Sequence, residues 1–104
     1  MSRAAIRYAK AVLSLAQDKN VAGDVQKDMQ HIMTTVADSS DLRMVLNSPL
    51  IKGEVKLSSL KEIFKNAGEV TQKLFDVLVE NKRVDLLAEV AKLYSVLFDQ
   101  LTNT

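Results

Sequence analysis

The sequence predicts an all-α protein that folds as a single compact bundle of about six helices. Apolar residues recur at three- and four-residue spacing along almost the whole chain, and strand-like alternation never persists. Only three glycines and one proline interrupt the 104 residues, so the breaks between helices are few and distinct. With 47% hydrophobic residues, a chain of this length can bury a core without disulfides, and it contains no cysteine.

The breaks divide the chain into six expected helices. Their ranges are about 3–18, 22–37, 41–46, 53–67, 69–80 and 84–101. The polar residues at 38–41 supply side-chain oxygens that can cap the third helix. Pro49 prevents that helix from continuing, and Gly68 is expected to close the fourth helix. We expect Leu50 and Ile51 to fold back on the core.

The sequence also assigns particular apolar residues to the core. Within the fourth helix, the residues expected to face inward are Leu57, Leu60, Ile63, Phe64 and Ala67. Met29, Met33 and Met44 are interpreted as flexible core filler.

The first and fifth expected helices carry more apolar surface than one core contact requires. A surface helix needs an apolar stripe somewhat over ~100° wide. Projected at ~100° per residue, the apolar positions cover roughly 220° of the helix at 3–18 and roughly 200° of the helix at 69–80. Two interpretations fit: both helices are central and bury two faces, or one stripe from each lines a groove for a partner helix. Periodicity alone leaves the two interpretations level.

The residues form no recognisable catalytic, metal-binding or phosphate-binding constellation, so we expect no catalytic residue, metal or cofactor. His31 is the only histidine, and it is interpreted as structural or exposed. Asp24, Lys27 and Asp28 lie near it as a mixed-charge set typical of a solvated face. The glutamates form no pair that the sequence places inside a pocket, and the three glycines are isolated.

The charge pattern argues against nucleic acid and membrane binding. The net charge is +1, and glutamates interleave with the lysines at 52, 56, 61 and 65. No stretch approaches the ~20 continuous apolar residues that cross a bilayer, so we expect no direct membrane insertion.

Three segments carry a family resemblance. They read RYAKA at 7–11, LNSPLI at 46–51 and LVENKRVDLL at 78–87. In this order and spacing they resemble the RYAKAL-type opening helix, the L-x-x-P-x-I/V turn and the LLxENGRLxLL stretch of one family. That family is the delta subunit of rotary ATP synthases, called the oligomycin-sensitivity-conferring protein in mitochondria.

The resemblance implies a six-helix bundle at the top of the catalytic head. There it would clasp the N-terminal helices of the alpha subunits in a groove between its first and fifth helices. The family's contact positions correspond here to Tyr8, Ala11 and Val77. The partner-binding set also includes Ala4 and Leu15, on the same stripe of the first helix, and Val70 and Leu74, the neighbours of Val77. The implied role is a non-catalytic stator component that helps couple proton transport to ATP synthesis.

The resemblance also sets expectations about domains and location. Residues 1–104 would be the N-terminal domain, and the second domain, through which the family engages the peripheral stalk, would be absent. The protein would lie at the cytoplasmic face of a bacterial inner membrane, or at the mitochondrial matrix face if eukaryotic. A bacterial source is favoured because the folded pattern begins directly after Met1.

One residue departs from the family pattern, and one alternative function stays open. Lys82 stands where the family often has glycine, and Asn81 is expected to take the left-handed conformation instead. The alternative function is a helical adaptor or regulatory domain that binds some other amphipathic helix. The wide apolar arcs favour either binder over an enzyme.

Overall fold

The computed structural model describes residues 2–103, which form six α-helices and one short 3-10 turn without any strand. The elements are α1 (Arg3–Asp18), α2 (Ala22–Asp38), α3 (Ser40–Asn47), α4 (Gly53–Ile63), α5 (Glu69–Glu80), the 3-10 turn η1 (Val84–Leu86) and α6 (Leu87–Thr102). The all-α class and the six-helix count are therefore confirmed for this part of the chain. The predicted bounds of the first and fifth helices agree with the structure, and the sixth begins with η1.

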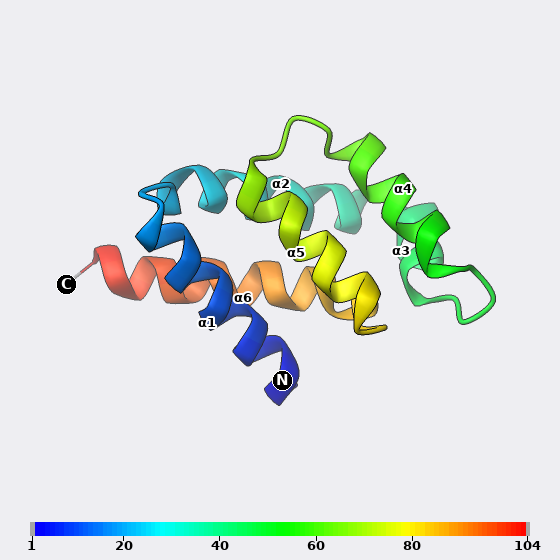
Figure 1. The fold of residues 1–104 in the computed structure, drawn as a ribbon, viewed down its shortest axis with the longest axis horizontal. Helices are drawn as coiled ribbons and strands as arrows, with labels where there is room; N and C mark the ends of the chain where they lie inside the picture. The colour runs from blue at the N-terminus through cyan, green and yellow to red at the C-terminus, as the bar shows by residue number, and fades with distance from the viewer. Residues whose placement is uncertain (1, 104) are drawn as a thin grey trace.

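The helices pack around α6, the long helix at the back of the bundle in Figure 1. Both α1 and α2 pack along α6, α5 lies beside α1, and α4 packs against α5. The short α3 contacts α2 and η1 at the end farthest from the C-terminus. The largest fully buried side chains come from α2, α4, α5 and α6, and they include Tyr94, Phe75, Met29, Ile32, Leu60, Leu78 and Leu87. One continuous core therefore joins the helices.

Two polar contacts hold α2 against α6. The Tyr94 hydroxyl donates a 2.7 Å hydrogen bond to the carbonyl oxygen of Ala22. One turn further along α2, Gln26 Nε2 donates to Ser95 Oγ at 2.9 Å. Because buried polar groups are costly without partners, these bonds favour one register of α2 along α6.

The expected cap between α2 and α3 is present. Ser39 is the N-cap of α3, and its side chain accepts a 3.1 Å hydrogen bond from the Leu42 amide. Arg43 then reaches back, and its Nη1 donates to the carbonyls of Val36 and Ala37 at 2.8 and 2.6 Å. The free amides of one helix and the free carbonyls of the other are thus satisfied at one corner.

The α3–α4 connection departs from expectation. Leu50 is 92% exposed, so the prediction that residues 50–51 fold back on the core is wrong for Leu50. The Leu50 amide donates to Ser48 Oγ at 3.2 Å, which gives a local turn with the side chain outside. Met44 is also wrong as core filler, because α3 buries Leu42 and Leu46 and leaves Met44 on the opposite side, 62% exposed. Met29, by contrast, is fully buried.

Helix α4 is shorter than expected. It ends at Ile63, which is 44% exposed rather than inward-facing, and Gly68 is the N-cap of α5 rather than the end of α4. The Phe64 carbonyl accepts hydrogen bonds from the Ala67 amide at 3.0 Å and from Gln72 Nε2 at 2.8 Å. Since these bonds hold the carbonyl within a turn, the chain leaves the helix there and Phe64 packs into the core.

Candidate partner-binding groove

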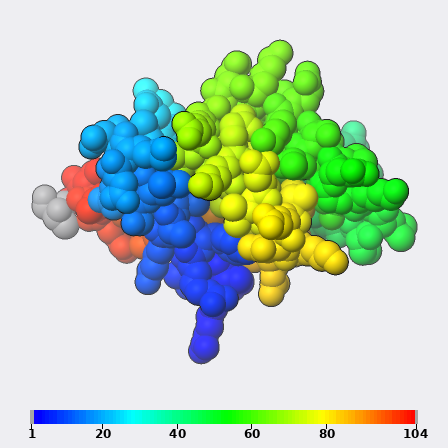
Figure 2. All heavy atoms as spheres, viewed as in Figure 1, coloured from blue at the N-terminus to red at the C-terminus, as the bar shows by residue number. Residues whose placement is uncertain are grey.

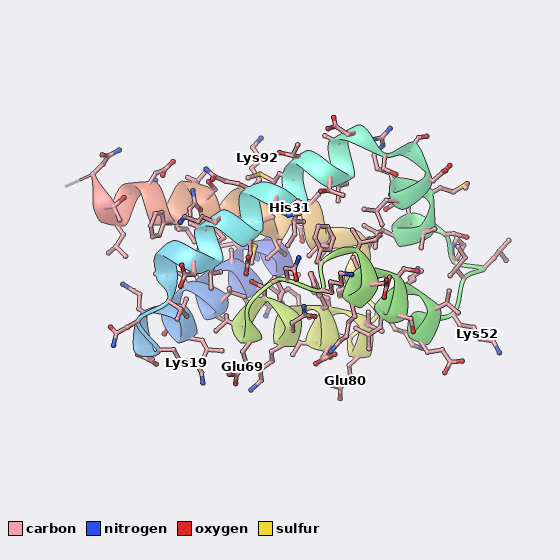
Figure 3. The ribbon with its side chains drawn as sticks, turned by 90° about the horizontal axis from the view of Figure 1, so that it is seen from above. Lys19, His31, Lys52, Glu69, Glu80 and Lys92 are labelled. Carbon is pink, nitrogen blue, oxygen red and sulfur yellow. The ribbon has the colours of Figure 1, made fainter. Side chains whose placement is uncertain are left out.

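Helices α1 and α5 lie antiparallel on one face of the molecule (Figure 2). At one end, Lys19 Nζ, just past α1, lies 3.7 Å from Glu69 Oε1 at the start of α5, and both labels sit together in Figure 3. At the other end, Asn81 Nδ2 donates a 2.8 Å hydrogen bond to the Tyr8 hydroxyl. Each end of α5 is thus joined to α1, and the space between the two helices is lined by their facing side chains.

That space is an apolar groove of about 120 Å³. Its lining residues are Tyr8, Ala11, Val12, Leu15, Val70, Lys73, Leu74 and Val77. The structure therefore brings together six of the seven predicted positions. The seventh, Ala4, lines an adjoining depression of about 330 Å³ that also includes Tyr8 and Ala11.

Burial divides the groove into a floor and a rim. Val70 and Leu74 form the floor and are each only 4% exposed, so they belong to the core as well. Tyr8, Leu15 and Val77 are half-buried, and Ala11 is exposed. The small Ala11 side chain leaves room for a close approach, and Tyr8 offers a large ring with a polar tip.

Each of the two interpretations of the wide arc accounts for part of α1. One stripe is buried within the bundle and holds Ala5, Ala9, Val12 and Ala16. The other stripe, which carries Tyr8, Ala11 and Leu15, stays partly open along the groove. A central position in the bundle thus explains the first stripe, whereas the second is covered only in part, because Tyr8 and Leu15 pack against the core and Ala11 is exposed.

The end of α5 is shaped by a left-handed residue. Lys82 has φ 58, whereas Asn81 has φ −86, so the expectation that Asn81 takes the left-handed role is wrong. The Lys82 amide bonds to the Val79 carbonyl and the Arg83 amide to the Leu78 carbonyl, at 3.0 and 2.8 Å. This paired pattern is a Schellman motif, which requires the left-handed conformation one residue beyond the C-cap. Asn81 is the C-cap itself, and its side chain is used to hold Tyr8.

The start of α5 is fixed by a residue that sequence reasoning missed. Asp28, on α2, accepts a 3.0 Å hydrogen bond from the Gly68 amide and a 2.7 Å bond from the buried Thr71 hydroxyl. A carboxylate at a helix N-terminus is also favoured by the helix dipole. Asp28 is therefore not merely part of a solvated face. No local signal reveals this, because Thr71 is 43 residues away in the sequence.

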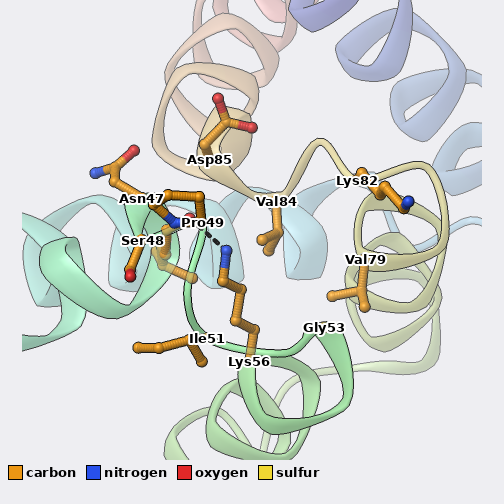
Figure 4. A pocket seen from close by; sticks show the side chains of 11 residues that line it. Asn47, Ser48, Pro49, Ile51, Gly53, Lys56, Val79, Lys82, Val84 and Asp85 are labelled. Atoms are coloured by element: carbon orange, nitrogen blue, oxygen red, sulfur yellow. Dashed lines mark hydrogen bonds between the residues drawn. The ribbon is translucent and has the colours of Figure 1, made fainter.

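The remaining hollows lie away from the predicted stripe. A larger one of about 500 Å³ separates the α3–α4 connection from the end of α5, and Lys56 Nζ reaches across it to the Leu46 carbonyl at 3.4 Å (Figure 4). His31 is exposed, in agreement with its interpretation as a structural or exposed residue. Its ring lies edge-on to the Phe64 ring, with 5.4 Å between the ring centroids.

No group of three or more His, Cys, Asp or Glu side chains within residues 2–103 could hold a metal ion. None of the helices in this range combines the length and the apolar character needed to span a bilayer.

Together the fold and the groove define a class: an all-α bundle with an open apolar channel between two antiparallel helices, a form suited to receiving a helix. A family model described as the ATP synthase delta (OSCP) subunit matches residues 4–104. The chain belongs to this family.

The relatives agree with this assignment. The chain is 49% identical over 102 residues to ATP synthase subunit delta of Christiangramia forsetii, covering 98% of this chain and 55% of that protein. It is 46% identical over 102 residues to the same subunit of Flavobacterium psychrophilum, covering 98% and 58%. A chain of the cryo-EM structure of the Toxoplasma gondii mitochondrial ATP synthase hexamer superposes with a TM-score of 0.81 at 31% identity, covering 90% of this chain and 53% of that one. This chain thus spans a little over half the length of the curated relatives.

Proposed function

We propose that this chain is a non-catalytic stator domain of an F-type ATP synthase. In this role the groove between α1 and α5 binds the N-terminal helix of an alpha subunit at the top of the catalytic head. The observation that carries the proposal is the open apolar groove, because it lies between the first and fifth helices in a member of the delta family.

The physics of such a contact is that of a helix laid in a groove. An amphipathic helix places residues at three- and four-residue spacing along the channel, and Ala11 leaves space for its backbone. Burial is favourable at roughly 25 cal/mol per Å² of apolar area, before the cost of association. Since α1 and α5 pack against one another and each end of α5 contacts α1, we expect the walls to need little rearrangement when a helix enters.

The work done by this domain is mechanical. Rotation of the rotor exerts torque on the catalytic head, and a stator keeps the head still by remaining bound to it. Coupling of proton transport to ATP synthesis then depends on this contact, without chemistry at the groove. Contact with the peripheral stalk is assigned to the second domain of the family, and the location to the cytoplasmic or matrix face of the membrane.

The test is a calorimetric titration with a synthetic peptide of the alpha-subunit N-terminus from the same source. We expect saturable one-to-one binding. Ala11→Arg places a bulky cation in the groove and is expected to lower the affinity more than about tenfold, equivalent to about 1.4 kcal/mol. Ala37→Arg, at an exposed alanine near the end of α2, is the matched control and is expected to bind normally.

The same titration separates the proposal from the adaptor alternative. A folded, monomeric domain that does not bind the alpha peptide would overturn the stator assignment and leave an adaptor with another amphipathic helix as partner. Equal loss of affinity in both arginine variants would show that the peptide binds elsewhere.

A further inference from the structure

The depression beside the groove contains two unpaired arginines. It is lined by Ala4, Arg7, Tyr8, Ala11 and Arg83, so Arg7 comes from α1 and Arg83 from the turn after α5. Within residues 2–103 neither guanidinium has a hydrogen bond or an ion pair, and the two ion pairs of this range lie elsewhere, at Lys19–Glu69 and Lys61–Asp76. Two cationic side chains thus flank one end of an apolar channel, one on each wall.

The position of Arg83 follows from the backbone. The Schellman motif reverses the chain at Lys82, and the Arg83 amide is held by the Leu78 carbonyl at 2.8 Å. Arg7 is one turn from both Ala4 and Ala11 on α1, so its stem borders the same small-residue surface. Arg7 therefore projects from a helix, and Arg83 projects from the hydrogen-bonded turn that follows α5.

The two ends of the groove differ in charge. At the far end, Lys19 and Glu69 are 3.7 Å apart and neutralise one another. At the near end, Tyr8 also lines the depression, and its hydroxyl accepts a hydrogen bond from Asn81. The lining of the near end contains no carboxylate. An apolar floor alone accepts a helix in either direction. Lys73 also lines the groove, and the two arginines add positive charge at the near end only, so the charge of this end can favour one direction.

We propose that the depression is a carboxylate subsite of the groove. It takes an Asp or Glu side chain that the bound helix carries at one end of its apolar stripe, and it thereby sets the direction in which that helix lies. The inference rests on the proposed function, since it describes the partner of the same groove. A guanidinium is suited to this task because its planar array of donors matches a carboxylate in two parallel hydrogen bonds.

Charge complementarity of this kind acts mainly on specificity. A helix laid in the reverse direction would leave its carboxylate near Glu69 and leave the arginines unpaired. Because Glu69 is already paired with Lys19, the wrong orientation is disfavoured by the pairs with Arg7 and Arg83 that it leaves unmade. The occupant is therefore an amphipathic helix whose acidic residue adjoins its apolar stripe, rather than any apolar helix of suitable length.

The test is a double-mutant cycle on the folded domain with the alpha N-terminal peptide as probe. Arg7→Gln and Arg83→Gln are each expected to lower the affinity about three- to tenfold at low salt. One variant of the peptide, in which a single acidic residue is replaced by its amide, is expected to bind the parent domain and the two arginine variants with equal affinity. Lys10→Gln on α1 and Lys92→Gln on α6 remove exposed cations outside the depression and are expected to change the affinity less than about twofold.

The outcomes separate this inference from the proposed function. If the arginine variants bind like the parent while Ala11→Arg does not bind, the subsite is overturned and the groove stands. Equal losses of affinity in Lys10→Gln and Arg7→Gln would also overturn the subsite, because they would indicate a general electrostatic attraction between the domain and the peptide. Absence of binding by the parent domain would instead remove the proposed function. An alpha segment without an acidic residue beside its apolar stripe would overturn the subsite alone.

Discussion

Asn81 Nδ2 donates a 2.8 Å hydrogen bond to the Tyr8 hydroxyl, across 73 residues of sequence. The bond joins the C-cap of α5 to the middle of α1 and holds the Tyr8 ring where the groove meets the adjoining depression. A half-buried aromatic anchor held in this way enters a complex with little loss of side-chain freedom.

Removal of the Tyr8 hydroxyl should separate positioning from contact. Tyr8→Phe keeps the ring and loses one partly exposed hydrogen bond, so we expect the free energy of unfolding to fall by less than about 1 kcal/mol. Affinity for the alpha peptide should fall less than in Tyr8→Ala, which removes the whole ring. Calorimetry with both variants checks this, and equal losses of affinity would mean that the ring itself contributes nothing to binding.

Two groove residues should differ in how much they contribute to stability. Leu74 is 4% exposed, and Leu74→Ala is expected to destabilise the domain by about 2–5 kcal/mol through a core cavity. Val77 is half-buried, and Val77→Ala is expected to cost about 1 kcal/mol or less while weakening peptide binding. Urea unfolding gives the first comparison and titration the second. A loss of stability in Val77→Ala as large as in Leu74→Ala would place Val77 in the core rather than on the rim.

Asp28 should contribute to stability through α5. Asp28→Ala removes the acceptor for the Gly68 amide and the buried Thr71 hydroxyl, so we expect a loss of about 1–3 kcal/mol. Asp24→Ala, an exposed acidic residue in the first turn of the same helix, is the control and should lose less than about 1 kcal/mol. Thermal unfolding followed by circular dichroism measures both. Similar values for the two variants would argue against a capping role for Asp28.

Lys82→Gly should stabilise the protein. Lys82 has φ 58, a conformation that is strained for a residue with a side chain, so we expect a gain of about 1 kcal/mol in the free energy of unfolding. Asn20, also at φ 58, ends α1 with the same pair of backbone bonds. Asn20→Gly should gain less, because asparagine tolerates this region better than lysine. Denaturant midpoints of the two variants test the order.

Tyr94 should make the protein sensitive to alkaline pH. Burial, and secondarily the charge of Asp28, raises the pKa of Tyr94 from 10.0 to about 12. The folded state therefore holds the phenolic proton more tightly than the unfolded state. The corresponding stability is fully present below pH 10 and is lost as the pH rises towards 12.

The Tyr94→Phe variant isolates this contribution. It lacks the bond to the Ala22 carbonyl and should be less stable by about 1 kcal/mol at neutral pH. Its stability should then decline less steeply than that of the parent between pH 10 and 12. Denaturant unfolding at a series of pH values measures the two slopes. Tyr8→Phe, which leaves Tyr94 in place, should retain the steep decline.

Much of the architecture follows from local patterns. The three- and four-residue apolar spacing, the polar cluster at 38–41 and the few breakers indicate six helices, and α1 and α5 have the predicted bounds. The excess apolar arc singled out these two helices, because a helical projection depends only on sequence, and the family resemblance then assigned the candidate groove residues. The three family segments pointed to the same pair of helices.

Other features were decided by contacts between distant segments. α4 ends early where Gln72 binds the Phe64 carbonyl, and Asp28 caps a helix that begins 40 residues later.

The sequence by itself determined the helical class, the helix order and the apolar stripes, because these follow from periodicity and caps within a few residues. Only the tertiary structure decided that one stripe of α1 is buried while the other faces α5 across a groove. It also decided that Asn81 binds Tyr8, and that Arg7 and Arg83 flank one depression. These arrangements depend on how the helices pack, and packing depends on side chains that are far apart in the chain.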